Sequence, residues 1–295
     1  MPKIKFLLCA FAACLTLVAC QAQAPTSFSN DGKISLALNF AQWQEHAGEG
    51  GRRLSRARSI AAITRVEIYV LFDKDTLAHA VAPVSATTGE FSAALEVPIG
   101  SERRVIVEAW EDQRGEGAPV RVFRGVQSGV DVQPNLAQEV EVTLYPLPTA
   151  GQSVVLVIGN GQGAPGSNNN LVPVTLISAD SLSGVQFDLN YDSNLIAPMS
   201  ALRANAVVFD TLASNRLVNE QGQVLRVLFF STASKRLPAL PDPTEIMNVL
   251  FQVHEGLSAG ARSALTFSNL VVLDAQRRRL GVLAVGGEFE VVGGR

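Results

Sequence analysis

The sequence predicts an all-β protein made of two β-sandwich domains, and three observations support this prediction. From residue 30 onward, no segment sustains the 3.6-residue apolar period of an amphipathic helix. Short segments instead alternate apolar and polar residues, as strands with one buried face do. The 24 glycines and 14 prolines suit the many turns that short strands require.

The clearest alternation occurs in three segments. It places the following apolar side chains on one face of each: Val66, Ile68, Val70 and Phe72; Val140, Val142 and Leu144; and Val185, Phe187, Leu189 and Tyr191. Strands of this kind, repeated at short spacing, are typical of β-sandwiches.

The N-terminus has the features of an export signal. Lys3 and Lys5 precede an apolar run, Phe6 to Leu17, that is too short to span a bilayer as a finished helix. The run ends in Leu-Val-Ala-Cys at residues 17–20, which resembles the bacterial lipobox. We therefore interpret residues 1–20 as a lipoprotein signal peptide with cleavage before an acylated Cys20. The alternative is an ordinary secretory signal in which Cys20 is incidental.

This resemblance implies an extracytoplasmic protein, lipid-anchored to a membrane, with the outer membrane or cell surface as the expected location. Several acyl chains on one residue give stable anchoring, whereas a single chain is marginal. Residues 21–29 are polar and serve as a short tether.

Two prolines, at residues 146 and 148, follow a complete strand and mark a domain boundary. The prediction is a first sandwich at residues 30–147, a linker at 148–152 and a second sandwich at 153–293. The first contains an Arg-rich strand at 103–110, a turn at 112–117, a strand ending at 123–125 and a last strand at 138–144. This order resembles immunoglobulin-like or transthyretin-like accessory sandwiches, which implies a spacer.

Residues 48–58 form a basic, glycine-rich insertion in the first domain. They are interpreted as a solvated loop, and the alternative is a contact with anionic lipid headgroups or a surface polymer.

The second domain carries several motifs in a fixed order. Val-Pro-Val at 172–174 is followed by GVQFDLNYDSNLI at 184–196, by EIMNVLFQV at 245–253 and by GEFEVV at 287–292. The order and spacing of these motifs resemble the cohesin domain. The resemblance implies a nine-stranded jelly-roll sandwich, related to carbohydrate-binding modules, that binds dockerin modules on secreted glycoside hydrolases.

Cohesins bind dockerins through one flat sheet face. Here that face would include Gln186, Asp188 and Asn190 on one strand, and Arg226 on the neighbouring strand at 223–230. Dockerin-binding cohesins usually present an Asn and an Asp two residues apart, where this chain has Gly184 and Gln186. The loop after the neighbouring strand, usually acidic and glycine-containing, is Ser-Thr-Ala-Ser-Lys-Arg at 231–236.

The sequence offers little support for catalysis or a resident cofactor. Its cysteines are Cys9, Cys14 and Cys20, so the body has no thiol or disulfide. His46, His79 and His254 lack the close second ligand of a zinc site. The glycine-rich segment 159–163 lacks the Lys-Ser/Thr pair of a phosphate loop and leads into a strand. Glu108, Glu111 and Asp112 are close in sequence but are a weak candidate for a glycosidase pair.

The formal charge of −3 argues against nucleic-acid binding. The leading hypothesis is thus a noncatalytic, surface-anchored protein that binds a dockerin-bearing secreted protein, with a link to polysaccharide degradation. Calcium, if involved, is expected on the dockerin. The alternatives are a carbohydrate-binding protein, which the absence of tryptophan from the second domain disfavours, and a structural envelope protein.

Overall fold

The computed structural model describes residues 31–39, 63–83, 90–112, 118–134, 136–148, 151–204, 211–219, 222–230 and 236–293. Within these ranges the regular elements are all β-strands, which confirms the predicted fold class. No helix long and apolar enough to cross a membrane occurs in the described ranges.

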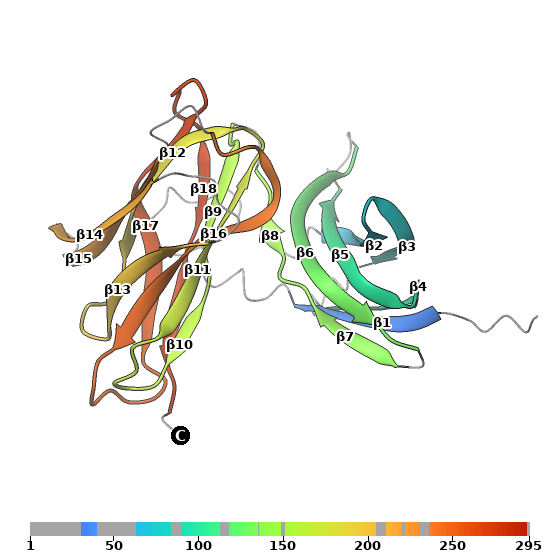
Figure 1. The fold of residues 1–295 in the computed structure, drawn as a ribbon, viewed down its shortest axis with the longest axis horizontal. Helices are drawn as coiled ribbons and strands as arrows, with labels where there is room; N and C mark the ends of the chain where they lie inside the picture. Colours follow the sequence, from blue (N-terminus) through green and yellow to red (C-terminus); the bar gives the residue numbers. More distant parts are fainter. Residues whose placement is uncertain are drawn as a thin grey trace, which may run out of the picture. The chain divides into compact units, whose positions relative to one another are not determined.

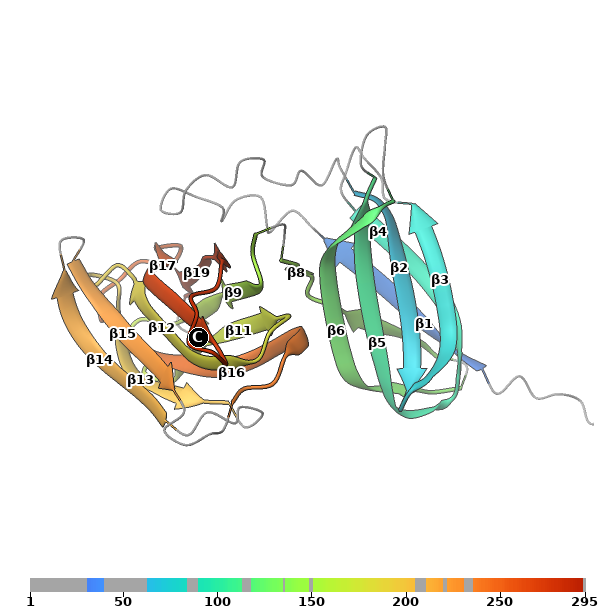
Figure 2. The same ribbon diagram turned by 90° about the horizontal axis from the view of Figure 1, so that it is seen from above.

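The first eight strands make two sheets that pack face to face (Figures 1 and 2). One sheet has the order β4-β1-β7, and the other has the order β3-β2-β5-β6-β8. Their bounds are β1 Asp31–Asn39, β2 Ile63–Phe72, β3 Asp75–Pro83, β4 Glu90–Pro98, β5 Gly100–Glu111, β6 Val120–Val132, β7 Ala137–Glu141 and β8 Tyr145–Pro146. One apolar cluster, which includes Ile34, Ile68 and Val107, fills the space between the two sheets.

Two details of this sandwich differ from the sequence prediction. Val66, Ile68 and Val70 are fully buried, but Phe72 is 49% exposed. Phe72 ends β2 directly before a tight turn in which Asp73 has a φ of 54°, so its ring contacts the guanidinium of Arg103 instead of the core. The strand expected to end at residues 123–125 continues as β6 to Val132.

Eleven further strands make the second sandwich, with sheet orders β10-β19-β17-β12-β15-β14 and β13-β16-β11-β9-β18. Their bounds are β9 Val154–Ile158, β10 Gly161–Gly163, β11 Asn170–Ser178, β12 Leu182–Asn190, β13 Ile196–Arg203, β14 Thr211–Asn219, β15 Gly222–Phe230, β16 Leu240–Val253, β17 Arg262–Asp274, β18 Val282–Val285 and β19 Gly287–Val291. Figure 2 shows β14, β15 and β12 in one layer, with β13, β16 and β11 in the other.

The predicted nine strands become eleven because two strands cross from one sheet to the other. β9 and β10 belong to different sheets although only two residues separate them. β18 and β19 also belong to different sheets, and only Gly286 separates them. The two crossing segments are in close contact: a Cβ on Gly287 would lie 2.2 Å from the carbonyl oxygen of Gly159. A glycine is therefore required at 287. The segment 159–163 leads into a strand, β10, as expected.

Four phenylalanines occupy the core of the second sandwich. Phe187, Phe229, Phe251 and Phe289 are each at most 1% exposed. The ring centroids of Phe251 and Phe289 are 5.9 Å apart, within the range of favourable aromatic pairs. Phe187 and Phe229 come from β12 and β15, so these two strands have a fixed inner face.

Residues Asp31–Arg295 form one compact unit. Among the described strands, no sheet contains both a strand from β1–β8 and a strand from β9–β19. Leu147 connects the two sandwiches. Its backbone N–H donates to the carbonyl oxygen of Val122 at 2.8 Å, which continues the pairing of β8 with β6. Its side chain is buried against the outer face of β9, in a cluster with Val155, Val157, Ile177 and Leu283.

The Leu147 contact predicts a stability effect at the start of the linker. Leu147→Ala removes a side chain that is only 7% exposed, and it should lower the free energy of unfolding by about 2–4 kcal/mol, as other buried leucine truncations do. Urea unfolding measures the change. The control is Leu136→Ala, because Leu136 is 58% exposed. Equal effects of the two substitutions would show that the Leu147 cluster contributes nothing.

Candidate recognition surface

The outer face of β17, β12, β15 and β14 is the candidate recognition surface. On β12, Val185, Phe187 and Leu189 belong to the core cluster. Because side chains alternate along a strand, Gly184, Gln186, Asp188 and Asn190 face outward. The structure thus places the predicted residues of β12 on one face, as expected from the sequence.

Strand register orders this surface into four rows that run across the strands β17, β12, β15 and β14. The rows are Leu273, Gly184, Phe230 and Thr211; Val271, Gln186, Leu228 and Ala213; Ser268, Asp188, Arg226 and Asn215; and Thr266, Asn190, Val224 and Leu217. The first two rows are mostly apolar, the third is entirely polar, and the fourth has two polar and two apolar residues.

The apolar half surrounds Gly184 and Gln186, the positions where dockerin-binding cohesins usually have Asn and Asp. Leu273 and Phe230 flank Gly184, while Val271 and Leu228 flank Gln186, and all four apolar residues are partly exposed. Gly184 adds no side chain and is itself buried, so the flanking apolar side chains form the surface here. This half offers apolar contact area beside a single side-chain amide, a combination typical of protein-binding surfaces.

An ion pair with a buried carboxylate occupies the centre of the polar half. The Asp188 side chain is 0% exposed, and it accepts two hydrogen bonds from Arg226: Nε to Oδ1 at 2.7 Å and Nη2 to Oδ2 at 2.8 Å. This bidentate geometry is the strong form of an Arg–carboxylate pair. The Arg226 side chain remains 43% exposed, so it presents a fixed positive group at the centre of the face.

Asn269 completes the partners of Asp188. Its side-chain amide donates to Asp188 Oδ2 at 2.6 Å. The register of β17 against β12 shifts between Gln186 and Asp188, and Asn269 lies in this bulge with a φ of 49°. Asparagine tolerates this left-handed conformation better than most residues. The alternation of apolar and polar residues in the sequence predicts neither β17 nor the role of Asn269.

These contacts determine the charge state of Asp188. The hydrogen bonds from Arg226, and secondarily that from Asn269, hold the pKa of the Asp188 carboxyl below its ordinary 3.8, although burial acts in the opposite direction. Asp188 is therefore anionic at neutral pH, and its charge is offset by Arg226.

Asn190, the last outward residue of β12, is held by β17. Its side-chain amide donates to the carbonyl oxygen of Thr266 at 3.2 Å, and its Oδ1 accepts from the Ser268 hydroxyl at 3.2 Å. Asn190 is therefore a positioned polar group on the face.

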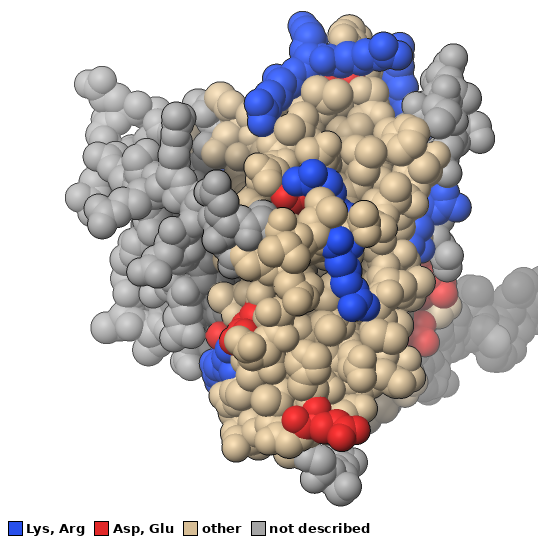
Figure 3. Space-filling view, turned by 90° about the vertical axis from the view of Figure 1, so that its left-hand side faces the viewer, with Lys and Arg blue, Asp and Glu red and all other residues tan. Residues whose placement is uncertain are grey.

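Charge is unevenly distributed on the side of the protein that carries β14 and β15. Figure 3 shows that uncharged residues cover most of the described surface there, with Lys and Arg gathered at the upper end and a carboxylate patch at the lower end. This side is therefore mostly uncharged, with a few charged side chains near its middle and further charges gathered at its two ends.

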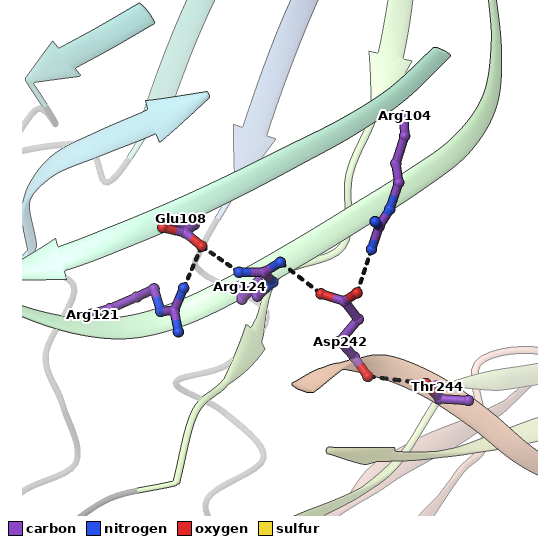
Figure 4. A network of polar contacts seen from close by, with 6 residues as sticks. All are labelled: Arg104, Glu108, Arg121, Arg124, Asp242 and Thr244. Atoms are coloured by element: carbon purple, nitrogen blue, oxygen red, sulfur yellow. Dashed lines mark hydrogen bonds and ion pairs between the residues drawn. The ribbon is translucent and has the colours of Figure 1, made fainter. Parts of the chain in front are cut away.

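Glu108, one of the three carboxylates considered for glycoside hydrolysis, belongs to a structural network (Figure 4). Glu108 lies 2.5 Å from both Arg121 and Arg124. Arg124 and Arg104 in turn both contact Asp242, at the start of β16. Two guanidinium groups hold Glu108, so we assign it to the packing of β5 and β6 and not to acid–base chemistry.

The described histidines have structural contacts. The His79 ring stacks on Tyr69 with centroids 4.5 Å apart, and His254 Nε2 lies 3.2 Å from the carbonyl oxygen of Ser193. Across the described ranges, no cluster of three or more His, Cys, Asp or Glu could hold a metal ion. Cys20, His46 and the insertion at 48–58 lie outside the described residues.

Tyr191, the one tyrosine of the second domain, is not available as a sugar-stacking platform. It is 9% exposed, and its ring packs against Phe251 with centroids 5.9 Å apart. Burial also raises the pKa of its hydroxyl. This placement adds to the case against carbohydrate binding by exposed aromatic rings.

The second sandwich matches a known protein family. A family model described as the cohesin domain matches residues 154–291. Similar solved structures include the sixth cohesin of Acetivibrio cellulolyticus scaffoldin B in complex with the Cel5 dockerin, with 21% identity, 47% of this chain and 99% of that chain covered, and a TM-score of 0.41.

Two other similar structures come from a bacterium and an archaeon. They are CaCohA2 of Clostridium acetobutylicum, with 23% identity, 49% and 94% coverage and a TM-score of 0.41, and a non-cellulosomal cohesin of Archaeoglobus fulgidus, with 19% identity, 48% and 91% coverage and a TM-score of 0.37. The search of curated proteins gave no match.

The Asp188 ion pair predicts a pH-dependent contribution to stability. Because the folded-state pKa of Asp188 is below 3.8, its contribution is complete above that pH and is lost as pH falls through the folded-state pKa. Asp188→Asn should therefore lower the unfolding temperature at pH 7, and the difference from the native chain should shrink below pH 4. A difference that stays constant from pH 7 to pH 3 would contradict the pairing with Arg226.

Proposed function

Because residues 154–291 form a cohesin domain, we propose that this chain is a noncatalytic binding protein that captures a dockerin-bearing secreted protein. The family match is the observation that carries the proposal. Binding takes place on the candidate recognition surface of β17, β12, β15 and β14, where Gln186, Asp188, Asn190 and Arg226 lie among partly exposed apolar residues.

The layout of this surface supports the proposal. Its apolar half supplies area that a partner removes from water, which is the main favourable term in protein association. The Asp188–Arg226 pair and Asn190 are held by hydrogen bonds before a partner arrives. A partner then meets ordered polar groups, and the entropy cost of fixing them has already been met in folding.

We further propose that a lipid on Cys20 anchors the chain at the cell surface, with the first sandwich as a spacer. The support is the lipobox-like sequence at residues 17–20 and the two lysines before the apolar run. In this arrangement the cohesin domain would hold a secreted enzyme, such as one that degrades polysaccharide, at the cell surface.

The proposed binding predicts the result of a capture experiment. The full mature chain is immobilised and exposed to the secreted and surface proteins of its own host, once with calcium and once with EDTA. We expect capture of a protein that contains a dockerin module and loss of that protein on chelation, because dockerins fold around calcium. Capture of no dockerin-bearing protein by the folded chain would contradict the proposal.

Matched variants locate the contact. Leu228→Glu places a charge in the apolar half and should weaken capture at least about tenfold, since truncations at interface centres commonly have effects of this size. Leu171→Glu is the control, because Leu171 is on β11 in the other sheet and is already 50% exposed. Equal loss in both variants would place the contact elsewhere.

The proposed anchor has a separate test. Cys20→Ala should abolish incorporation of radiolabelled palmitate and move the protein from the membrane to the soluble fraction, because no other residue would carry the lipid. Cys14→Ala changes a cysteine within the same apolar run and should leave both properties intact. Membrane association that persists in Cys20→Ala without a label would show that another feature anchors the chain.

A further inference from the structure

Arginines gather at one end of the candidate recognition surface. Leu182, the first residue of β12, pairs with Leu237 on one side and with Asp274, the last residue of β17, on the other. Arg236 directly precedes Leu237, and Arg277, Arg278 and Arg279 follow Asp274 in the turn between β17 and β18. All four arginines are exposed. We call them the basic end.

The local carboxylates offset only part of this charge: Asp274 pairs with Arg278, which leaves the other three arginines. Asp274 is 3% exposed, and it is occupied by its own turn: Oδ1 accepts from the N–H groups of Gln276 and Arg278 at 2.8 Å each, and Oδ2 accepts from Arg278 Nε at 2.7 Å. Asp180 is the exposed carboxylate of this end. In the part of the chain that the structure describes, no ion pair reaches Arg236, Arg277 or Arg279.

The opposite end of the same sandwich is acidic. Asp192 follows β12, Glu255 follows β16, and Glu288 and Glu290 lie on β19, while Arg262 at the start of β17 is the local cation. The recognition surface therefore lies between a positive end and a negative end, in line with the upper and lower ends of Figure 3. Such a field orients a charged partner during approach and raises its association rate.

The turn that carries Arg277, Arg278 and Arg279 is constrained. Arg277 has a φ of 64°, a left-handed conformation that costs energy for an arginine and would cost none for glycine. The Arg279 guanidinium donates to the carbonyl oxygen of Leu270 at 3.0 Å. Two arginines are thus held on a tight turn beside Leu273, which belongs to the first row of the recognition surface.

We propose that the partner of this cohesin domain is a dockerin whose contacting surface is acidic at the end that meets residues 277–279. This inference rests on the proposed function and adds the charge of the partner to it. The basic end adjoins the apolar half of the surface, so a dockerin that covers Gly184 and Gln186 places its edge against these arginines. Acidic side chains there gain complementary charge, whereas basic ones are repelled.

A display library of dockerin modules, with contacting helices that range from acidic to basic, tests the inference against the full mature chain. Enrichment of dockerins with Asp or Glu at the edge of the contacting helix supports it. Selection of dockerins with neutral or basic edges overturns the charge inference and leaves the proposed function intact. Selection of no dockerin overturns both.

Charge variants then test the role of the basic end with a selected dockerin. Arg277→Gly with Arg279→Gln removes two charges and relieves the backbone at 277, so the unfolding temperature should hold. We expect association about three- to tenfold slower at low salt, and a weaker dependence of the association rate on salt, since charges at an interface rim act mainly on the on-rate. Glu288→Gln with Glu290→Gln is the control at the opposite end, and it should not slow association.

An unchanged on-rate in the Arg277→Gly, Arg279→Gln variant would overturn the inference. Co-sedimentation with vesicles of phosphatidylglycerol and phosphatidylcholine covers the other source of negative charge. If the native chain binds these vesicles and the variant does not, while dockerin association is unaffected, the basic end is a membrane contact and the proposal fails.

Discussion

The packing of Phe187 and Phe229 in the core of the second sandwich is the constraint on which its surface depends. Both rings are fully buried, so β12 and β15 cannot shift by one residue without exposing them and burying the opposite faces. The burial of two phenylalanines therefore decides that Gln186, Asp188 and Arg226 face outward. The same constraint brings Arg226 opposite Asp188, the pairing from which the bidentate ion pair follows.

The ion pair and the bulge in β17 give the candidate recognition surface its own character. Asp188 is held by Arg226 from β15 and by Asn269 from β17, so a single carboxylate joins three strands. Gly184 and Gln186 occupy the positions where the sequence resemblance expects Asn and Asp, so in the proposed function the neighbouring apolar residues supply the main contact area. We relate these replacements to a partner whose contacting residues differ from those of the usual dockerins. The arginines at 277–279 are the basis for proposing that its edge is acidic.

The sequence predicted the strands whose alternation is regular, and it failed where geometry interrupts the alternation. β12 was predicted because its apolar residues recur at every second position. β17 was missed because its bulge at Asn269 shifts that period, and β14 because exposed polar residues such as Asn215 and Arg216 occur on both of its faces. The Asp188–Arg226 contact joins residues 38 positions apart, so it depends on strand register, which alternation alone does not specify. The cleavage and lipidation of Cys20 stay predictions.

Oxidative footprinting of side chains, with and without the captured dockerin-bearing protein, tests the central claim most directly. Both outer faces of the second sandwich carry residues that report oxidation. They are the partly exposed Leu228, Phe230 and Leu273 on the recognition surface, and the exposed Met199, Leu202 and Leu171 on the other sheet, each compared with its own reactivity in the free chain. The account predicts that the partner protects the first three from oxidation and leaves the other three as reactive as in the free chain. Protection of Met199 and Leu202, with Leu228 and Phe230 unchanged, would contradict it.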